Sequence, residues 1–150
     1  MSLARRRIRA ITTVATGAVA VVLATAQVAS AQGNWFLMQT DDDNPGGHVV
    51  FEPEYDGVKL ADKQDDGYAV HITVWKNKGN DYLYDFYNAR GEGKWTYRSN
   101  RSGPRFDLPE NTCLKFRIRL TKGVTKNVVP GTTDFATWQN ANGNHEPQYC

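Results

Sequence analysis

Three basic side chains alternate along one segment of the sequence, at Lys115, Arg117 and Arg119. Alternate residues of a β-strand point to the same face, so these cations would form one row. The even-numbered positions from 114 to 120 are all apolar, which indicates that the opposite face packs into a core. Cations on an exposed face can bind phosphate or an acidic protein, although such charges also favour solubility. The segment therefore predicts a strand with a candidate partner-binding face.

Groups suited to catalysis are few and scattered. The sequence has three histidines, and no motif of a zinc protease, a serine hydrolase or a nucleotide-binding loop occurs. A small nuclease needs a base, an acid and cations for the phosphate. Residues of these types occur without a spacing that brings them together; they are His71, Glu92, Arg117 and His145. We therefore expect a protein that is not an enzyme, with a small secreted hydrolase or nuclease as the alternative.

Two further binding roles follow from residue types alone. Residues 99–105 could form a rigid loop that occupies the active site of a secreted protease, which would make the protein an inhibitor. Clustered tyrosines and tryptophans could form a sugar-binding platform, although Trp75 and Trp95 suit a hydrophobic core equally well.

Acidic residues gather in residues 62–66, where a calcium ion is one interpretation. A calcium loop of the EF-hand type beginning at Asp62 needs a glutamate at its twelfth position. That position is Thr73, which lies in a strand pattern. A solvated acidic turn is therefore preferred, with a looser calcium site around these residues left open. We expect no metal and no cofactor.

The two cysteines, Cys113 and Cys150, lack both the histidine partners of a zinc site and a C-x-x-C spacing. Neither a zinc site nor a redox-active thiol pair is expected. In an oxidising compartment an even number of cysteines favours a disulfide. We predict a bond between them, which closes a loop worth about 3–4 kcal/mol of stability in the chain-entropy model.

An apolar patch near the start of the sequence contains Trp35, Phe36, Leu37 and Met38. Residues 41–47 follow it and predict a loop, because they hold three aspartates, a proline and two glycines. The patch has two interpretations. It is a first strand buried in the domain's own core, which we favour slightly, or an N-terminal arm that binds another protein.

The N-terminus has the features of a secretory signal. Four arginines precede an apolar run over residues 10–26, and Ala29, Ser30 and Ala31 are the small residues that signal peptidase requires. We predict cleavage after residue 31, an extracellular protein, and no membrane anchor, since the run is short for a span. The chain has 18 basic and 16 acidic residues, and the signal holds four of the basic ones, which leaves 14. After cleavage the 16 acidic residues outnumber the 14 basic ones, and this small acidic excess argues against nucleic acid as a partner.

Short β-prone segments separated by turn residues follow. Their alternation, with no helical pattern, predicts a single all-β domain, an antiparallel β-sandwich of immunoglobulin-like or related type. We assign it to residues 47–150, after the signal at 1–31 and an N-terminal extension at 32–46. Asp65-Asp66-Gly67 predicts a hairpin turn. The expected strands cover residues 48–51, 58–62, 68–75, 82–87, 95–97, 113–120 and 134–138.

A set of turn glycines and core positions resembles a known family. The motifs are Gly47-x-Val49-Val50-Phe51, Gly57-x-x-Leu60-x-Asp62, Asp66-Gly67-x-Ala69-Val70, Asn88-x-x-Gly91-x-Gly93, Leu108-Pro109-Glu110 and Phe116-Arg117-Ile118-x-Leu120. They resemble small secreted β-sandwich proteins of high-GC Gram-positive bacteria, and most of all the adaptor subunit of umbrella toxin particles. The resemblance covers residues 47 to about 122.

The resemblance implies a non-enzymatic adaptor in a secreted antibacterial assembly. Such an adaptor bridges a lectin-like subunit to a large toxin, and its N-terminal extension enters a cleft of the lectin. The corresponding region here is residues 32–46, with the apolar patch at 35–38. The expected function is therefore secreted protein–protein interaction, through this patch and through the row formed by Lys115, Arg117 and Arg119.

Overall fold

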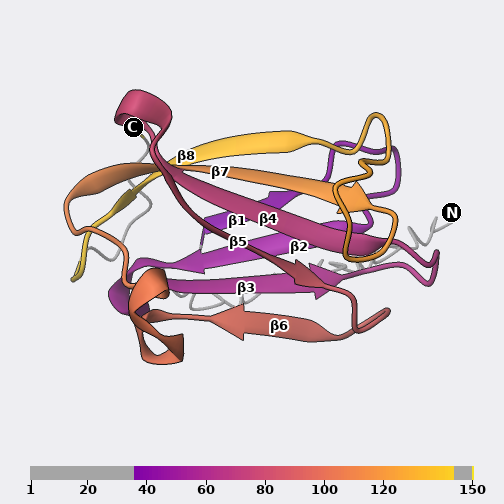
Figure 1. Cartoon of the computed structure of the whole chain (residues 1–150), viewed down its shortest axis with the longest axis horizontal. Helices are drawn as coiled ribbons and strands as arrows, with labels where there is room; N and C mark the ends of the chain where they lie inside the picture. Colours follow the sequence, from indigo (N-terminus) through magenta and orange to yellow (C-terminus); the bar gives the residue numbers. More distant parts are fainter. Residues whose placement is uncertain (1–35, 144–149) are drawn as a thin grey trace, which may run out of the picture. The chain divides into compact units, whose positions relative to one another are not determined.

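The protein folds into two antiparallel β-sheets. The computed structural model describes residues 36–143 and residue 150. Within these residues, sheet A has the strand order β1-β2-β3-β6 and sheet B the order β5-β4-β7-β8 (Figure 1). No helix among them is long and apolar enough to cross a membrane. The strands are β1 (Phe36–Gln39), β2 (Gly47–Glu52), β3 (Gly57–Asp62), β4 (Ala69–Lys76), β5 (Tyr82–Asn88), β6 (Trp95–Arg98), β7 (Thr112–Thr121) and β8 (Asp134–Asn140).

Short 3-10 turns lie between some of these strands. They are η1 (Pro53–Tyr55), η2 (Lys78–Asn80), η3 (Asn100–Ser102) and η4 (Pro104–Phe106). η1 and Asp56, which follows it, connect β2 to β3 as a hairpin within sheet A. η3 and η4 follow β6 and lead the chain back towards sheet B.

The two sheets enclose one hydrophobic core, which confirms the all-β sandwich architecture expected from the sequence. Aromatic rings from both sheets meet in it. The ring centroid of Phe51, on β2, lies 4.9 Å from that of Phe116, on β7, and Phe116 lies 4.9 Å from Trp138, on β8. Ring pairs at such distances add about 0.5–1.5 kcal/mol each beyond simple burial. The core therefore holds the two sheets together through direct aromatic contact.

The alternation predicted for residues 113–120 is confirmed in β7. Its even-numbered residues are buried in the core, whereas Lys115, Arg117 and Arg119 lie half-buried on the outer face. β7 pairs with β4 on one side and β8 on the other. The three cations are therefore flanked by strands on both sides and stand near the middle of the outer surface of sheet B.

The hairpin predicted at Asp65-Asp66-Gly67 is wrong. β3 pairs with β2 and β6 in sheet A, whereas β4 pairs with β5 and β7 in sheet B, so residues 63–68 cross between the sheets. Gly67 has a φ of +74°, a turn conformation that glycine adopts without strain. The Asp-Gly pair marks a turn correctly, but a turn signal alone does not say which strands pair.

β1 belongs to the sandwich, although the sequence assigned its residues to an extension. It pairs with β2, and Phe36 and Met38 point into the core. The Phe36 ring centroid lies 5.3 Å from that of Trp138 in the other sheet. Leu37 points the opposite way and is 61% exposed. Phe36 and Met38 therefore belong to a core strand, as in the first of the two interpretations, and they are not free to anchor a partner. Trp35 lies outside the described residues.

Two fully buried asparagines connect the sheets by hydrogen bonds. Asn140, on β8, donates through Nδ2 to Asp56 Oδ1 at 2.8 Å, and Asp56 lies in the turn between β2 and β3. Asn88, on β5, donates through Nδ2 to the carbonyl oxygen of Leu60, on β3, at 2.9 Å. By strand register Asn140 is level with the start of β7 and Asn88 with its end. The sheets are thus joined near both ends of the central strands.

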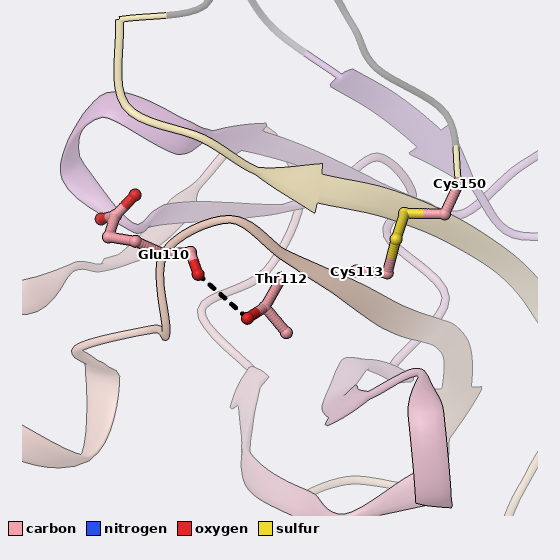
Figure 2. The surroundings of a disulfide bond; sticks show 4 residues. All are labelled: Glu110, Thr112, Cys113 and Cys150. Atoms are coloured by element: carbon pink, nitrogen blue, oxygen red, sulfur yellow. Dashed lines mark hydrogen bonds between the residues drawn. A yellow bond between two sulfur atoms is a disulfide. The ribbon is translucent and has the colours of Figure 1, made fainter.

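A disulfide joins Cys113, near the start of β7, to Cys150, which confirms the predicted pairing (Figure 2). The two Cα atoms are 6.0 Å apart, an ordinary distance for a disulfide. Figure 2 also shows the turn before β7, where the Thr112 hydroxyl donates to the Glu110 carbonyl at 3.0 Å. Because Cys113 has the same alternation as Lys115, the bond lies on the outer side of sheet B.

Candidate functional site

The outer surface of sheet B carries the row of cations that the sequence singled out. Lys115 lies opposite Trp75 of β4, and Arg117 lies opposite Phe135 of β8. Consecutive cations of the row are about 7 Å apart, because two residues of a strand advance the chain by that distance. We call the surface formed by Lys115, Arg117, Arg119, Trp75 and Phe135 the basic face.

Aromatic rings support two of the three cations. The guanidinium carbon of Arg117 lies 4.9 Å from the centroid of the Trp75 ring, and Lys115 Nζ lies 5.1 Å from that of Phe135. Arg117 also donates from Nη2 to Thr73 Oγ1 at 3.0 Å. Each cation–π contact is worth about 0.5–1 kcal/mol at a partly exposed site. These contacts hold the charges close to the sheet, so less side-chain freedom is lost when a partner binds.

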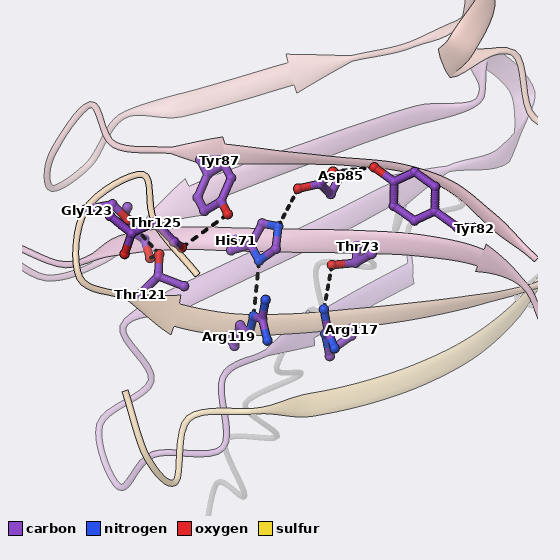
Figure 3. Close-up of polar contacts among 11 residues, drawn as sticks. His71, Thr73, Tyr82, Asp85, Tyr87, Arg117, Arg119, Thr121, Gly123 and Thr125 are labelled. Atoms are coloured by element: carbon purple, nitrogen blue, oxygen red, sulfur yellow. Dashed lines mark hydrogen bonds and ion pairs between the residues drawn. The ribbon is translucent and has the colours of Figure 1, made fainter. Parts of the chain in front are cut away.

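Arg119, the third cation, begins a chain of hydrogen bonds across three strands (Figure 3). Its Nε donates to His71 Nδ1 at 3.1 Å. Because Nδ1 accepts, the ring proton lies on Nε2, which donates to Asp85 Oδ2 at 2.8 Å. Tyr82 donates its hydroxyl to the other carboxylate oxygen of Asp85. The Tyr87 ring stacks on His71 at a centroid distance of 4.1 Å, and His71 is only 3% exposed.

The electrostatics of the network agree with this hydrogen-bond pattern. Burial lowers the pKa of His71, so the imidazole is neutral at neutral pH, as an Nδ1 that accepts from Arg119 requires. Burial on its own would raise the pKa of Asp85, but the hydrogen bonds from Tyr82 and His71 outweigh it and lower that pKa. A neutral imidazole therefore lies between a cationic arginine and an ionised aspartate.

The cations of the basic face have no direct carboxylate partner within residues 36–143. The ion pairs in that part of the chain join Lys59 to Glu52 and His71 to Asp85. Asp85 reaches Arg119 only through the His71 ring. Burial lowers the pKa of Arg117, and repulsion from the like charge of Arg119 lowers it further. A carboxylate from a partner would relieve that repulsion.

Of the residues considered for a nuclease, the described structure brings His71 and Arg117 near each other on the outer face of sheet B, where the charge of Arg117 acts on His71. His71 has hydrogen bonds on both ring nitrogens and is enclosed by Tyr87, so it offers no free base. Glu92 lies in the turn between β5 and β6, where its charge acts on Asp62 instead. His145 lies outside the described residues.

The structure also describes the acidic stretch at residues 62–66 and the segment at 99–105. In the described part of the chain, no three side chains of the metal-ligating types come together as a metal site. Burial, followed by repulsion from Asp66 and Glu92, raises the pKa of Asp62. Residues 99–105 fold into η3 and most of η4. The inhibitor role of this segment stays a prediction.

No family model matches this sequence, and a search of curated proteins gives no significant match. The resemblance to toxin-particle adaptors therefore stays a prediction. The function has to be inferred from the geometry of the surface itself.

Sequence reasoning found the cations of the basic face but missed the residues that hold them. Asp85 and Tyr82, on β5, were seen only as part of a β-prone segment. His71 lies between Val70 and Ile72, which are fully buried, so the alternation of the strand predicts that its side chain points outward. The hydrogen-bond partners of His71 cannot be predicted from the sequence, because they depend on the register between β4, β5 and β7.

Proposed function

We propose that the protein is a secreted, non-enzymatic interaction module that binds an acidic protein partner through the basic face. The proposal rests on the row of Lys115, Arg117 and Arg119, whose charges no carboxylate of the described residues pairs with directly. Trp75 and Phe135 flank the row. Arginine and tryptophan are the residue types that dominate binding energy at protein interfaces, which supports an interaction role for this surface.

Two further observations support the non-enzymatic and secreted parts of the proposal. His71 is committed to Asp85 and Arg119, and its neutral ring is closed off from solvent. The Cys113–Cys150 disulfide is typical of oxidising compartments, as is the signal-like N-terminal sequence of proteins exported to them.

In its most specific form, the proposal is an adaptor that bridges a lectin-like subunit to a large toxin in an extracellular antibacterial complex. This form rests on the sequence resemblance. The N-terminal contact that the resemblance implies cannot use Phe36 or Met38, which are buried in the core. Among the described residues of the apolar patch, Leu37 is the accessible one. The basic face would then provide one of the two binding surfaces that an adaptor needs.

Affinity capture from the culture medium of the producing cells tests the proposal. The baits are the wild-type protein, Lys115→Glu and the matched control Lys94→Glu, in which an exposed lysine of the β5–β6 turn undergoes the same charge reversal. We expect a partner with an acidic surface to be retained by wild type and Lys94→Glu, lost with Lys115→Glu, and released as salt is raised. Identification by mass spectrometry then checks for a toxin or a lectin. Failure of wild type to retain a protein at low salt, or equal retention by Lys115→Glu, contradicts the proposal.

A further inference from the structure

A pocket of about 330 Å³ opens on the outer side of sheet A, away from the strands that form the basic face. Its volume lies at the lower end of the range for small-molecule sites. It lies where the ends of β2 and β6 meet the turns η1 and η3. The lining residues are Glu52, Tyr55, Lys59, Tyr97, Ser99 and Arg101.

Because Gly57 has no side chain, Tyr97 and Glu52 can pack closely against it beside this pocket. A Cβ on Gly57 would lie 2.6 Å from the hydroxyl oxygen of Tyr97 and 3.0 Å from Glu52 Oε2. With glycine in this position, the Tyr97 hydroxyl can reach the side chains of Ser99 and Glu52. Ser99 is itself fixed, because it begins η3 with a reciprocal capping arrangement with Ser102. The position of Tyr97 is therefore set before any ligand arrives.

The pocket combines exposed aromatic faces with both kinds of hydrogen-bonding group. Tyr55 and Tyr97 are 44% and 39% exposed. Trp95 is also exposed and lies two residues before Tyr97 on the same face of β6, which extends the aromatic surface. Glu52 provides acceptors and Lys59 provides donors beside these rings. A sugar needs this combination, since one face of its ring is apolar C–H and its rim is hydroxyl.

The charges of the pocket favour an acidic ligand. Lys59 pairs with Glu52, so these two charges offset each other. The guanidinium carbon of Arg101 lies 5.8 Å from the Tyr55 ring centroid, and no carboxylate of the described residues is within ion-pair distance of it. A guanidinium can bind a carboxylate through two parallel hydrogen bonds. One cation in the pocket is thus available to a carboxylate on the ligand.

We propose that this pocket binds a carboxylated sugar, such as a uronic acid at the end of an acidic polysaccharide. The sugar ring packs against Tyr97 and Tyr55, and its carboxylate pairs with Arg101. Its hydroxyl groups bond to Glu52 and Lys59. This site lies on a different sheet from the basic face, so it extends the function beyond protein binding and does not depend on it.

An NMR titration of the purified, isotope-labelled protein tests the proposal. The probes are glucuronic acid and a disaccharide that ends in glucuronate, with glucose as the neutral counterpart. We expect saturable shifts at the backbone amides of Tyr97 and Arg101 with the glucuronates, and at least about tenfold weaker binding of glucose, the factor for one lost charge-assisted hydrogen bond. No saturable shift with either glucuronate at millimolar concentration, or equal binding of glucose, overturns the proposal.

Two variants and a matched control locate the site. Arg101→Gln is expected to weaken glucuronate binding about tenfold or more. Arg105→Gln should leave it unchanged, and it is a matched control because Arg105 is also exposed, lies in a 3-10 turn and has its guanidinium 4.5 Å from an aromatic centroid, that of Phe106. Gly57→Ala is expected to displace Tyr97 and weaken binding without changing any charge, while thermal melting checks that the fold persists.

Several results would contradict this location. Equal glucuronate binding by Arg101→Gln and Arg105→Gln would show that Arg101 does not bind the carboxylate. Unchanged glucuronate binding by a folded Gly57→Ala would show that the position of Tyr97 does not matter for binding. An acidic peptide that binds the same residues more tightly than the glucuronates would replace the sugar by a protein ligand and overturn the proposal.

Discussion

The outer surfaces of the two sheets contain the same kinds of residue but use them differently. On sheet B, Arg119 bonds to His71, His71 to Asp85, and Asp85 to Tyr82. On sheet A, the pocket has an arginine without a carboxylate partner among the described residues and two tyrosines with exposed rings. The residues of sheet B form a closed network of hydrogen bonds, in which Arg119 also contributes its charge to the basic face. In the pocket of sheet A, Arg101 and the two tyrosine rings are exposed instead. Residue type alone therefore does not distinguish a group that supports the fold from one that recognises a ligand; strand register does.

The largest change in the free energy of unfolding is expected for the inner face of sheet A, and almost none for a neighbouring residue on its outer face. Phe36→Ala should lower the free energy of unfolding by about 3–5 kcal/mol, because it leaves a cavity beside Phe51 and Trp138. Leu37→Ala, one residue along β1, should change it by no more than about 0.5 kcal/mol, because Leu37 is exposed. Urea unfolding of both variants measures the difference. Similar values for the two would mean that β1 does not bury the Phe36 side of the strand in the core.

Loss of the disulfide should have the next largest effect, and on sheet B. The double variant Cys113→Ser with Cys150→Ser should lose about 3–4 kcal/mol, because the bond restricts the unfolded chain over a separation of 37 residues. Urea unfolding measures this loss, and hydrogen exchange shows whether β7 and β8 lose protection before the strands of sheet A. Unchanged stability of the double variant would show that the cross-link adds nothing to the fold.

Removal of His71, at the centre of the closed network, should lower the free energy of unfolding by less than loss of the disulfide. It should still lower it by more than removal of His48, a histidine on the outer face of sheet A. His71→Ala leaves Asp85 and Arg119 without their partner and should lower the free energy of unfolding by about 1–3 kcal/mol. His48, which points outward from β2 with no such network, serves as the control, and His48→Ala should cost less than about 1 kcal/mol. Equal costs would show that the network does not support the fold.

Acid should weaken the closed network. Burial lowers the pKa of His71 below its ordinary value of 6.5, so below that pH the unfolded chain binds a proton that the folded chain does not. Stability therefore falls as the pH drops from about 6.5. The pKa of Asp85 is lowered too, so its contribution disappears only as the pH falls below about 4.

Urea unfolding at about pH 7.5 and about pH 5.5 measures this acid loss. His71→Gln should reduce the loss, and His48→Gln provides the comparison, because burial lowers the pKa of His48 as well. If His71→Gln loses as much stability as wild type between these pH values, protonation of His71 is not the cause.

The smallest effect on stability is expected for the basic face. Lys115 has no ion pair with a described residue and lies over the Phe135 ring, so Lys115→Ala should change the free energy of unfolding by about 0.5 kcal/mol or less. Thermal or urea unfolding tests this. A loss well above 1 kcal/mol would place Lys115 among the residues that support the fold, as in the closed network of the same sheet.

The strands could be predicted from the sequence because each one has a buried and an exposed side. In β7 the alternation of apolar and basic residues gave both the strand and the outward direction of its cations. Strand pairing could not be predicted in the same way. Asp65-Asp66-Gly67 has the composition of a hairpin turn, yet it connects different sheets, because both neighbours of β3 are already provided by β2 and β6.

The contacts of the two outer surfaces could not be predicted, since they join residues far apart in the chain. His71 meets Asp85 at a separation of 14 residues and Arg119 at 48, and both contacts depend on exact pairing of β4 with its neighbours. The pocket on sheet A combines residues from β2, η1, β3, β6 and η3, and no local pattern marks it. The role of Gly57 there depends on a side chain 40 positions later, that of Tyr97.

The two buried asparagines have a mechanical consequence. Asn88 and Asn140 join the sheets at opposite ends of the central strands, and neither amide is exposed to water that could replace its bonds. Sliding one sheet over the other would have to break both attachments together. Peeling off an edge strand such as β1 breaks its pairs with β2 one after another. Under tension, the sandwich should therefore resist shear between its layers and yield first by unzipping at an edge.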